Sequence, residues 1–168
     1  MVIQHKIGHI STYESAGKTM DWLPLQWFET SKRILHKQTK AGLSVSLKFL
    51  QENPALAEGD ILWDDGKSLL VIEILPCQTL VIQPADLFEM ASVCYEIGNK
   101  HLPLFYEEGQ VLVPFDAPLF RLLAAQGYQV SQAEKKLCRP LKTTVLPHGS
   151  KAGETIFSKI LKMTTPHE

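Results

Sequence analysis

The sequence of 168 residues contains no run of about 18 apolar residues, the length that a membrane-spanning helix requires. Its first residues lack the positive charges followed by an apolar stretch that mark a secretory signal peptide. Lysine and arginine together number 17 and aspartate and glutamate 18, so no strong overall field draws the chain to nucleic acid or to an anionic membrane. These absences predict a cytoplasmic protein with no nucleic-acid or membrane partner.

Cysteine is also scarce, with only Cys77, Cys94 and Cys138, which are widely spaced and form no C-x-x-C pair. An odd number at such spacing argues against a disulfide framework and against a structural zinc site. Cys94 falls on the apolar face of a predicted helix, where a thiol usually behaves as a small buried hydrophobe. For Cys77 and Cys138 two interpretations stay open, a secondary metal ligand or a free structural thiol, and the second is favoured.

The first 75 residues carry the patterns of β-strands. Over residues 43–49 apolar side chains alternate with polar ones, which predicts a half-buried strand. The Asp65-Gly66 step is a strong signal for a β-hairpin. His5 and His9 lie in another candidate strand and are interpreted as solvent-facing. The runs predicted as strands are residues 3–10, 32–37, 43–49, 61–63 and 69–75. We therefore predict a β-rich domain over residues 1–75.

The second half alternates in the order strand, helix, strand, strand, helix, strand. Asp86 and Glu89 have the spacing of a capping box at the start of the first helix, and Asp116 is placed to cap the second just before Pro118. The predicted elements are residues 80–83, 86–97, 102–106, 111–115, 117–126 and 128–138. This order predicts a ferredoxin-like (βαββαβ) domain over residues 76–142, with two helices on one face of an antiparallel sheet. The whole chain is thus predicted to be α+β.

Two linking segments complete the predicted organisation. Pro76-Cys77-Gln78 is interpreted as a short hinge between the two domains, because proline stops a strand and the periodicity changes beyond it. Residues 143–168 are predicted to form a flexible C-terminal tail. Within the tail, residues 151–165 have an amphipathic pattern, which is interpreted as a marginal helix on the protein's own surface, with docking on a partner as the alternative.

The first predicted helix leads into Gly98-Asn99-Lys100-His101. Its apolar face is predicted to consist of Leu87, Met90, Ala91, Cys94 and Ile97. Gly98 is predicted to end the helix, because glycine adopts the left-handed conformation that closes helix ends. His101 is then expected at an exposed corner. Taken alone, an exposed histidine after a helix end is a weak signal for a functional site.

A wider pattern surrounds this histidine. Residues 94–104, CYEIGNKHLPL, resemble the signature region of the urease accessory protein E family, the nickel metallochaperones, in which a Gly-Asn-(Arg or Lys)-His run carries the metal-binding histidine. The hairpin at residues 58–66 is similar to the N-terminal domain of that family, and residues 115–128 are similar to its second C-terminal helix. The resemblance covers about residues 1–148 of the chain.

The resemblance implies a chaperone that carries Ni²⁺ to urease during assembly of its metallocentre and that is not an enzyme. It implies a homodimer in which two copies of His101 meet near the twofold axis, so that one ligand per chain becomes two at one site. His148 would add a further ligand, by analogy with C-terminal histidines in the family. The implied partners are the urease apoprotein and the urease accessory GTPase, and pairing of dimers around one metal stays open.

The chemistry of imidazole agrees with this interpretation. A neutral imidazole binds Ni²⁺, Cu²⁺ and Zn²⁺ well, so zinc or copper is expected to substitute for nickel in vitro. A loose shell favours stepwise transfer of the metal, whereas a closed four-ligand site would retain it. Because imidazole must be unprotonated to coordinate, binding is expected to weaken below about pH 6.5. Since the tail holds only His148 and His167, high-capacity metal storage is not expected.

Two other functional classes compete with metal carriage. A small hydrolase using Asn99 and His101 is poorly supported, because the sequence shows no nucleophile–base pair, Gly-rich phosphate loop or paired catalytic carboxylates near the histidine. A non-metal adaptor for complex assembly, whose N-terminal domain binds a peptide or a partner's strand, remains the alternative. A metal carrier needs His101 and His148, whereas an adaptor should tolerate alanine at both.

Overall fold

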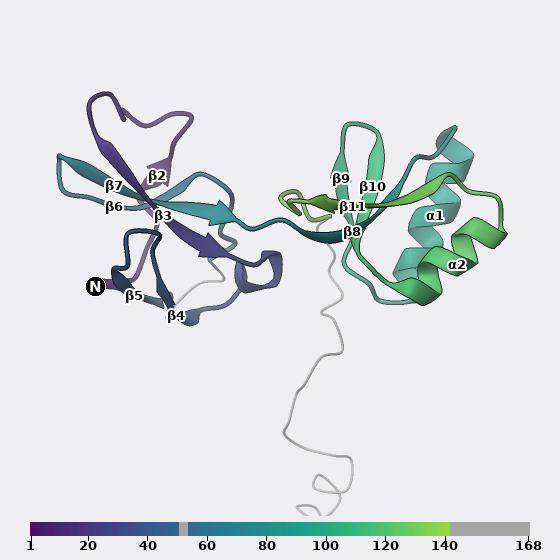
Figure 1. The fold of residues 1–168 in the computed structure, drawn as a ribbon, viewed down its shortest axis with the longest axis horizontal. Helices are drawn as coiled ribbons and strands as arrows, with labels where there is room; N and C mark the ends of the chain where they lie inside the picture. The colour runs from purple at the N-terminus through teal and green to yellow at the C-terminus, as the bar shows by residue number, and fades with distance from the viewer. Residues whose placement is uncertain (51–53, 142–168) are drawn as a thin grey trace, which may run out of the picture.

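A computed structural model describes residues 1–50 and 54–141 (Figure 1). The strands of the described chain form three sheets, with strand orders β1-β5-β4, β2-β6-β7-β3 and β11-β8-β10-β9. The first two sheets belong to the N-terminal half, and the third carries both α-helices on one face (Figure 1). The structure therefore confirms the predicted α+β class. Within residues 1–50 and 54–141, no helix has the length and apolar character needed to span a bilayer.

The N-terminal half packs two small sheets around a shared core. Its elements are β1 Val2–Ile3, β2 Gly8–His9, β3 Thr19–Leu25, the 3-10 helix η1 Trp27–Glu29, β4 Ile34–Gln38, β5 Ser44–Lys48, β6 Asp60–Asp64 and β7 Ser68–Ile74. Along β5, Val45 and Leu47 are buried whereas Ser44 and Lys48 are exposed, as the alternation predicts. These side chains meet apolar residues of β3, β6 and β7 in one cluster.

Two predictions for this half were wrong. Residues 3–10 do not form one strand, because β1 pairs with β5 in one sheet and β2 pairs with β6 in the other. The seven-residue strand β3 was not predicted, and its Pro24 masks the strand pattern. Among the described residues, β3 lies at the edge of its sheet and forms ladder pairs with β7 alone. An edge strand has one side without ladder hydrogen bonds, and there it tolerates proline.

The C-terminal half has the predicted ferredoxin-like arrangement. Its elements are β8 Cys77–Ile82, α1 Leu87–Asn99, β9 Phe105–Glu107, β10 Gln110–Pro114, α2 Ala117–Ala125 and β11 Val130–Lys135. All neighbouring strands in its sheet are antiparallel. Val93 and Ile97 of α1 and Leu119 and Leu123 of α2 are buried against β8 and β10.

The junction between the halves differs from the prediction. Cys77 and Gln78 already belong to β8, where they pair with β11, so they do not form a hinge. Trp27 packs edge-on against Phe105, with 5.6 Å between ring centroids. Leu137, beyond β11, is buried with Phe105 in a cluster separate from the one beneath the helices. Trp27 thus joins the N-terminal half to the C-terminal sheet at this separate apolar cluster.

The last described residues run beside β9. The Tyr106 amide donates to the Arg139 carbonyl at 3.2 Å, and the Leu141 amide donates to the Leu104 carbonyl at 2.8 Å. The segment therefore extends the sheet at its β9 edge. His148 lies outside the described residues, seven positions after Leu141.

Candidate functional site

Helix α1 begins with a side-chain cap. The Asp86 carboxylate accepts a hydrogen bond from the Glu89 amide at 2.8 Å, as predicted. The Glu89 carboxylate, however, accepts from the Ala85 amide at 2.8 Å and not from that of Asp86. These bonds satisfy amide groups that the first helical turn leaves without partners. They fix where the helix starts, and its length then places the Gly98–His101 segment.

The end of α1 corrects the prediction for Gly98. The helix continues through Gly98 to Asn99, and the residue with left-handed backbone is His101, at φ 54°. The His101 amide donates to the Gly98 carbonyl at 3.0 Å, and the Leu102 amide donates to the Ile97 carbonyl at 3.3 Å. This pair of bonds is the Schellman motif, with His101 at the position that glycine usually occupies.

The register of the hydrophobic residues explains this ending. In a Schellman motif the residue after the left-handed position packs against a residue in the last helical turn. Here Leu102 and Ile97 both pack in the core beneath the helices. Because these two apolar residues set the register, His101 falls at the left-handed position, and its side chain is exposed beyond the helix. Histidine is enriched there relative to most non-glycine residues, but the conformation still costs about 1–2 kcal/mol.

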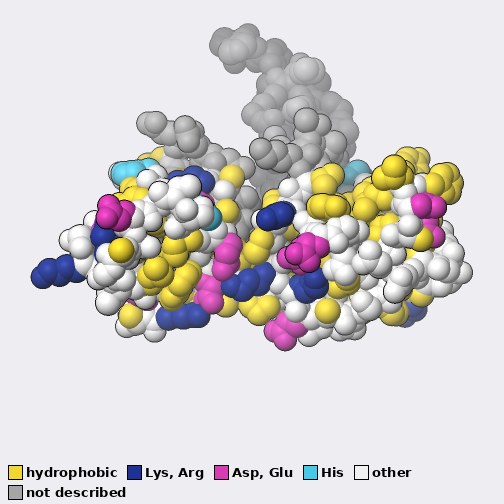
Figure 2. All heavy atoms as spheres, turned by 90° about the horizontal axis from the view of Figure 1, so that it is seen from above, with side chains coloured by type: hydrophobic (Ala, Val, Ile, Leu, Met, Phe, Trp, Pro, Cys, Tyr) yellow, Lys and Arg dark blue, Asp and Glu magenta, His cyan; other side chains and the backbone are white. Residues whose placement is uncertain are grey.

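The outer face of α1 is apolar and exposed. Leu87, Phe88 and Tyr95 are 87%, 79% and 71% exposed, and Ala91 is exposed beside them. The prediction that Leu87 and Ala91 face the core was therefore wrong, because Val93 and Ile97 fill it while Met90 and Cys94 are half-buried. Figure 2 shows hydrophobic side chains gathered over the part of the molecule that holds the helices. Contiguous apolar surface of this kind is typical of a protein–protein interface.

Cys94 and Cys138 offer no activated thiolate. Cys94 is half-buried, with its Sγ 4.0 Å from Met90 Sδ, and burial raises the pKa of its thiol. Burial likewise raises the pKa of the Cys138 thiol. A raised pKa keeps a thiol protonated, and the thiolate is the form that binds metal. Within residues 1–50 and 54–141, no three histidine, cysteine, aspartate or glutamate side chains gather into a metal-binding group.

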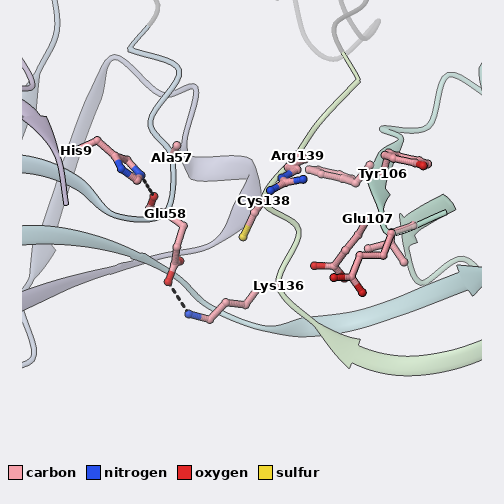
Figure 3. A pocket seen from close by; sticks show the side chains of 11 residues that line it. His9, Ala57, Glu58, Tyr106, Glu107, Lys136, Cys138 and Arg139 are labelled. Atoms are coloured by element: carbon pink, nitrogen blue, oxygen red, sulfur yellow. Dashed lines mark hydrogen bonds and ion pairs between the residues drawn. The ribbon is translucent and has the colours of Figure 1, made fainter. Parts of the chain in front are cut away.

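A cavity of about 430 Å³ lies between the two halves, and the sequence did not predict it. His9 and Glu58 line one side, Tyr106 and Glu107 the other, and residues 136–139 pass between them (Figure 3). The Lys136 ammonium contacts the Glu58 carboxylate at 2.8 Å. The residues come from separate segments that only the tertiary fold brings together, so no local sequence signal indicated them.

His9 is part of the wall of this cavity. Its imidazole contacts the Glu58 carbonyl oxygen at 2.9 Å and Ser11 Oγ at 2.7 Å. The interpretation of His9 as a solvent-facing residue was therefore wrong. His5, in contrast, is exposed as expected.

Comparison with known proteins identifies the family. Residues 3–75 match the model described as UreE urease accessory protein, N-terminal domain, and residues 77–148 match that of the C-terminal domain. The chain is 38% identical to the urease accessory protein UreE of Flavobacterium johnsoniae over 97% of its own length and 99% of that protein. It is 36% identical to the Haemophilus influenzae protein of that name, over 84% and 78% of the two chains. The chain therefore belongs to the UreE urease accessory protein family.

Proposed function

We propose that this protein is a cytoplasmic, non-enzymatic carrier of Ni²⁺ for urease assembly, and that a homodimer holds the metal between two copies of His101. The observation that carries the proposal is the backbone of His101, an exposed imidazole in a left-handed conformation that glycine would adopt at lower cost. Strained positions of this kind are common at functional sites. The family relationship supplies the role in urease maturation.

The outer face of α1 supports the homodimer. Residues 87, 91 and 95 are spaced by four, so they form one stripe along the helix. The next position on this stripe is residue 98 or 99, immediately before His101. Gly98 is exposed, and a Cβ atom added there would meet nothing within 4 Å. A second copy packed on the stripe would therefore lie close to the end of the helix.

Twofold symmetry then solves the problem of ligand number. One imidazole does not hold a metal ion tightly, but an isologous interface repeats every group, so two imidazoles face each other across the axis. We propose that His148 supplies a further ligand. Two firm ligands and one supplied by the tail would form an open shell from which a recipient protein can take the metal, with Zn²⁺ or Cu²⁺ as substitutes in vitro.

The proposal assigns different tasks to the segments of the chain. Residues 76–142 would dimerise and bind metal, residues 1–75 would bind a partner, and residues 143–168 would present His148. The partners would be the urease apoprotein and the urease accessory GTPase. The alternative is an adaptor that assembles the same complexes without metal, and it requires neither histidine.

Calorimetric titration with Ni²⁺ at neutral pH, with the oligomeric state measured alongside, distinguishes the metal carrier from the adaptor. His101→Asn is the preferred variant, because asparagine tolerates the left-handed conformation and removes the imidazole. We expect one Ni²⁺ per dimer or per pair of dimers, with binding lost in His101→Asn and weakened in His148→Asn. His36→Asn, which removes an exposed histidine from β4, is the matched control and should bind as wild type does. Unchanged binding in His101→Asn, or none in the wild type, would favour the adaptor.

A further inference from the structure

Strand β4 has an open outer edge. The Phe49 amide donates to the Arg33 carbonyl at 2.8 Å, and the Thr39 amide donates to the Leu43 carbonyl at 2.9 Å. In an antiparallel ladder, hydrogen-bonded pairs alternate with non-hydrogen-bonded ones, so the backbone groups of residues 34, 36 and 38 point away from β5. β4 is the last strand of its sheet, and among the described residues no strand pairs with this outer side.

The open edge is bounded and accessible. Beyond its end, the Lys40 amide donates to the Trp22 carbonyl at 2.8 Å, so β3 covers the continuation of this edge. Ile34 is 58% exposed, and His36 and Gln38 are exposed with it. The pairing of β4 with β5 is continuous over five residues, without a bulge or proline. A bulge and a proline are two of the devices with which proteins block an edge strand, and β4 has neither.

The surroundings of this edge are positively charged. Residues 30–51 contain five basic residues and no acidic one. Lys37 is paired with Glu29 at 2.8 Å, and Lys40 with Glu73 at 2.7 Å. The remaining three are Lys32, Arg33 and Lys48, all exposed and without an ion pair to any described residue. Lys48 lies directly opposite Ile34 on β5, and Arg33 immediately precedes β4.

We propose that the outer edge of β4 binds an extended acidic segment of a partner protein by adding it as a further strand. The backbone groups of residues 34, 36 and 38 would form the ladder, and Ile34 would contact an apolar side chain of the segment. Carboxylates of the segment, on the face opposite to its apolar side chains, would meet Arg33. A second copy of β4 is disfavoured as the occupant, because pairing two such edges would bring like charges together. This proposal does not depend on metal binding. The Ni²⁺ titration can therefore fail without affecting it, because that titration does not probe peptide binding at the outer edge of β4.

The test uses the full chain labelled with ¹⁵N and a capped peptide of alternating glutamate and valine as the probe. We expect amide shifts concentrated at residues 34, 36 and 38, and weaker binding as salt is raised. The matched control peptide, alternating lysine and valine, should not bind. Reversing the charge with Arg33→Glu should weaken binding of the acidic peptide by roughly threefold, since an exposed ion pair contributes modestly.

The hydrogen bonds between the outer edge of β4 and the peptide can be removed either in the protein or in the peptide. His36→Pro removes an outward amide without breaking a bond to β5, and it should reduce affinity at least about tenfold, whereas His36→Val keeps the amide and should bind as wild type does. If His36→Pro does not fold, a peptide N-methylated at alternate amides removes the same bonds from the ligand. Absence of shifts at β4, equal binding of the two peptides, or full affinity after loss of these amides would overturn the proposal.

Discussion

Replacing Phe88 by alanine should dissociate the proposed homodimer without weakening the folded monomer. Phe88 is 79% exposed on the outer face of α1, so in one chain its ring contributes little to the core. The core beneath the helix instead depends on Val93 and Ile97, which lie on the opposite side. The substitution therefore separates the interface from the fold.

The size of the effect follows from symmetry. An isologous interface contains Phe88 twice, so one substitution removes two rings from it. Burying a phenylalanine side chain fully contributes about 1.5–3 kcal/mol, which gives about 3–6 kcal/mol for the pair. Each 1.4 kcal/mol is a factor of ten, so the dimer dissociation constant should rise by roughly two to four orders of magnitude.

Sedimentation equilibrium over a range of protein concentrations measures this constant directly. Phe28→Ala is the matched control, because Phe28 is also a partly exposed phenylalanine, 48% accessible, but lies on η1 in the N-terminal half. Phe28→Ala should change the dimer dissociation constant by less than about twofold relative to the wild type. The reasoning is refuted if Phe88→Ala leaves the constant unchanged, or if the variant monomer unfolds at a clearly lower temperature than the wild-type monomer.

Two further predictions concern the N-terminal half. The Lys18 ammonium, 2.6 Å away, and further hydrogen bonds lower the pKa of Asp64 from 3.8 to about 2, so the stability that this carboxylate contributes is complete above about pH 4 and is lost as pH falls through 2. The melting temperature should fall between these pH values, and Asp64→Asn should lower the melting temperature at pH 5 and make that fall smaller. Gly59→Ala should cost about 2–4 kcal/mol in urea unfolding, since φ is +80° and the added Cβ would lie 2.8 Å from Ile10 Cγ2. Gly66→Ala, at φ +85° in open space, isolates the backbone part and should cost about 1–2 kcal/mol; equal losses at the two glycines would contradict the steric argument.

The C-terminal half was predictable because its signals are local. The Asp116 carboxylate accepts from the Leu119 amide at 2.7 Å, which is the cap that the sequence predicts before Pro118. Gly127, at φ 87°, follows the end of α2 as predicted. Caps and helix stops act over a few residues, so the sequence alone can locate them.

The N-terminal half was less predictable because its strands are defined by distant partners. β1 and β2 have two residues each, and each pairs with a strand about 40 residues or more away. No periodicity can be read from two residues. The same holds for the cavity in Figure 3, whose walls come from residues near positions 9, 58, 106 and 138.

The errors at α1 have a different cause. Glycine is the usual left-handed residue after a helix, so local chemistry favoured Gly98, yet the contact between Ile97 and Leu102 moved that position to His101. Leu102 was the available signal, because the residue after the left-handed position is often apolar. Likewise, helical periodicity indicates that one face is apolar but not whether it packs inside one chain or between two chains.

Helix α1 departs from local sequence preference in two features, its exposed apolar stripe and the left-handed His101 at its end, and the two lie close together. The apolar stripe leaves hydrophobic side chains in contact with water, which is unfavourable. The left-handed backbone of His101 also raises the conformational energy of the folded chain. Neither feature stabilises a monomer. Sequences that depart from local preference usually do so at functional positions. A symmetric partner on the stripe would bury the apolar side chains and, near the helix end, bring the two imidazoles toward one metal ion. Dimerisation and metal binding would then stabilise each other, and the measured affinity for Ni²⁺ should fall with the dimer fraction rather than with the stability of the monomer.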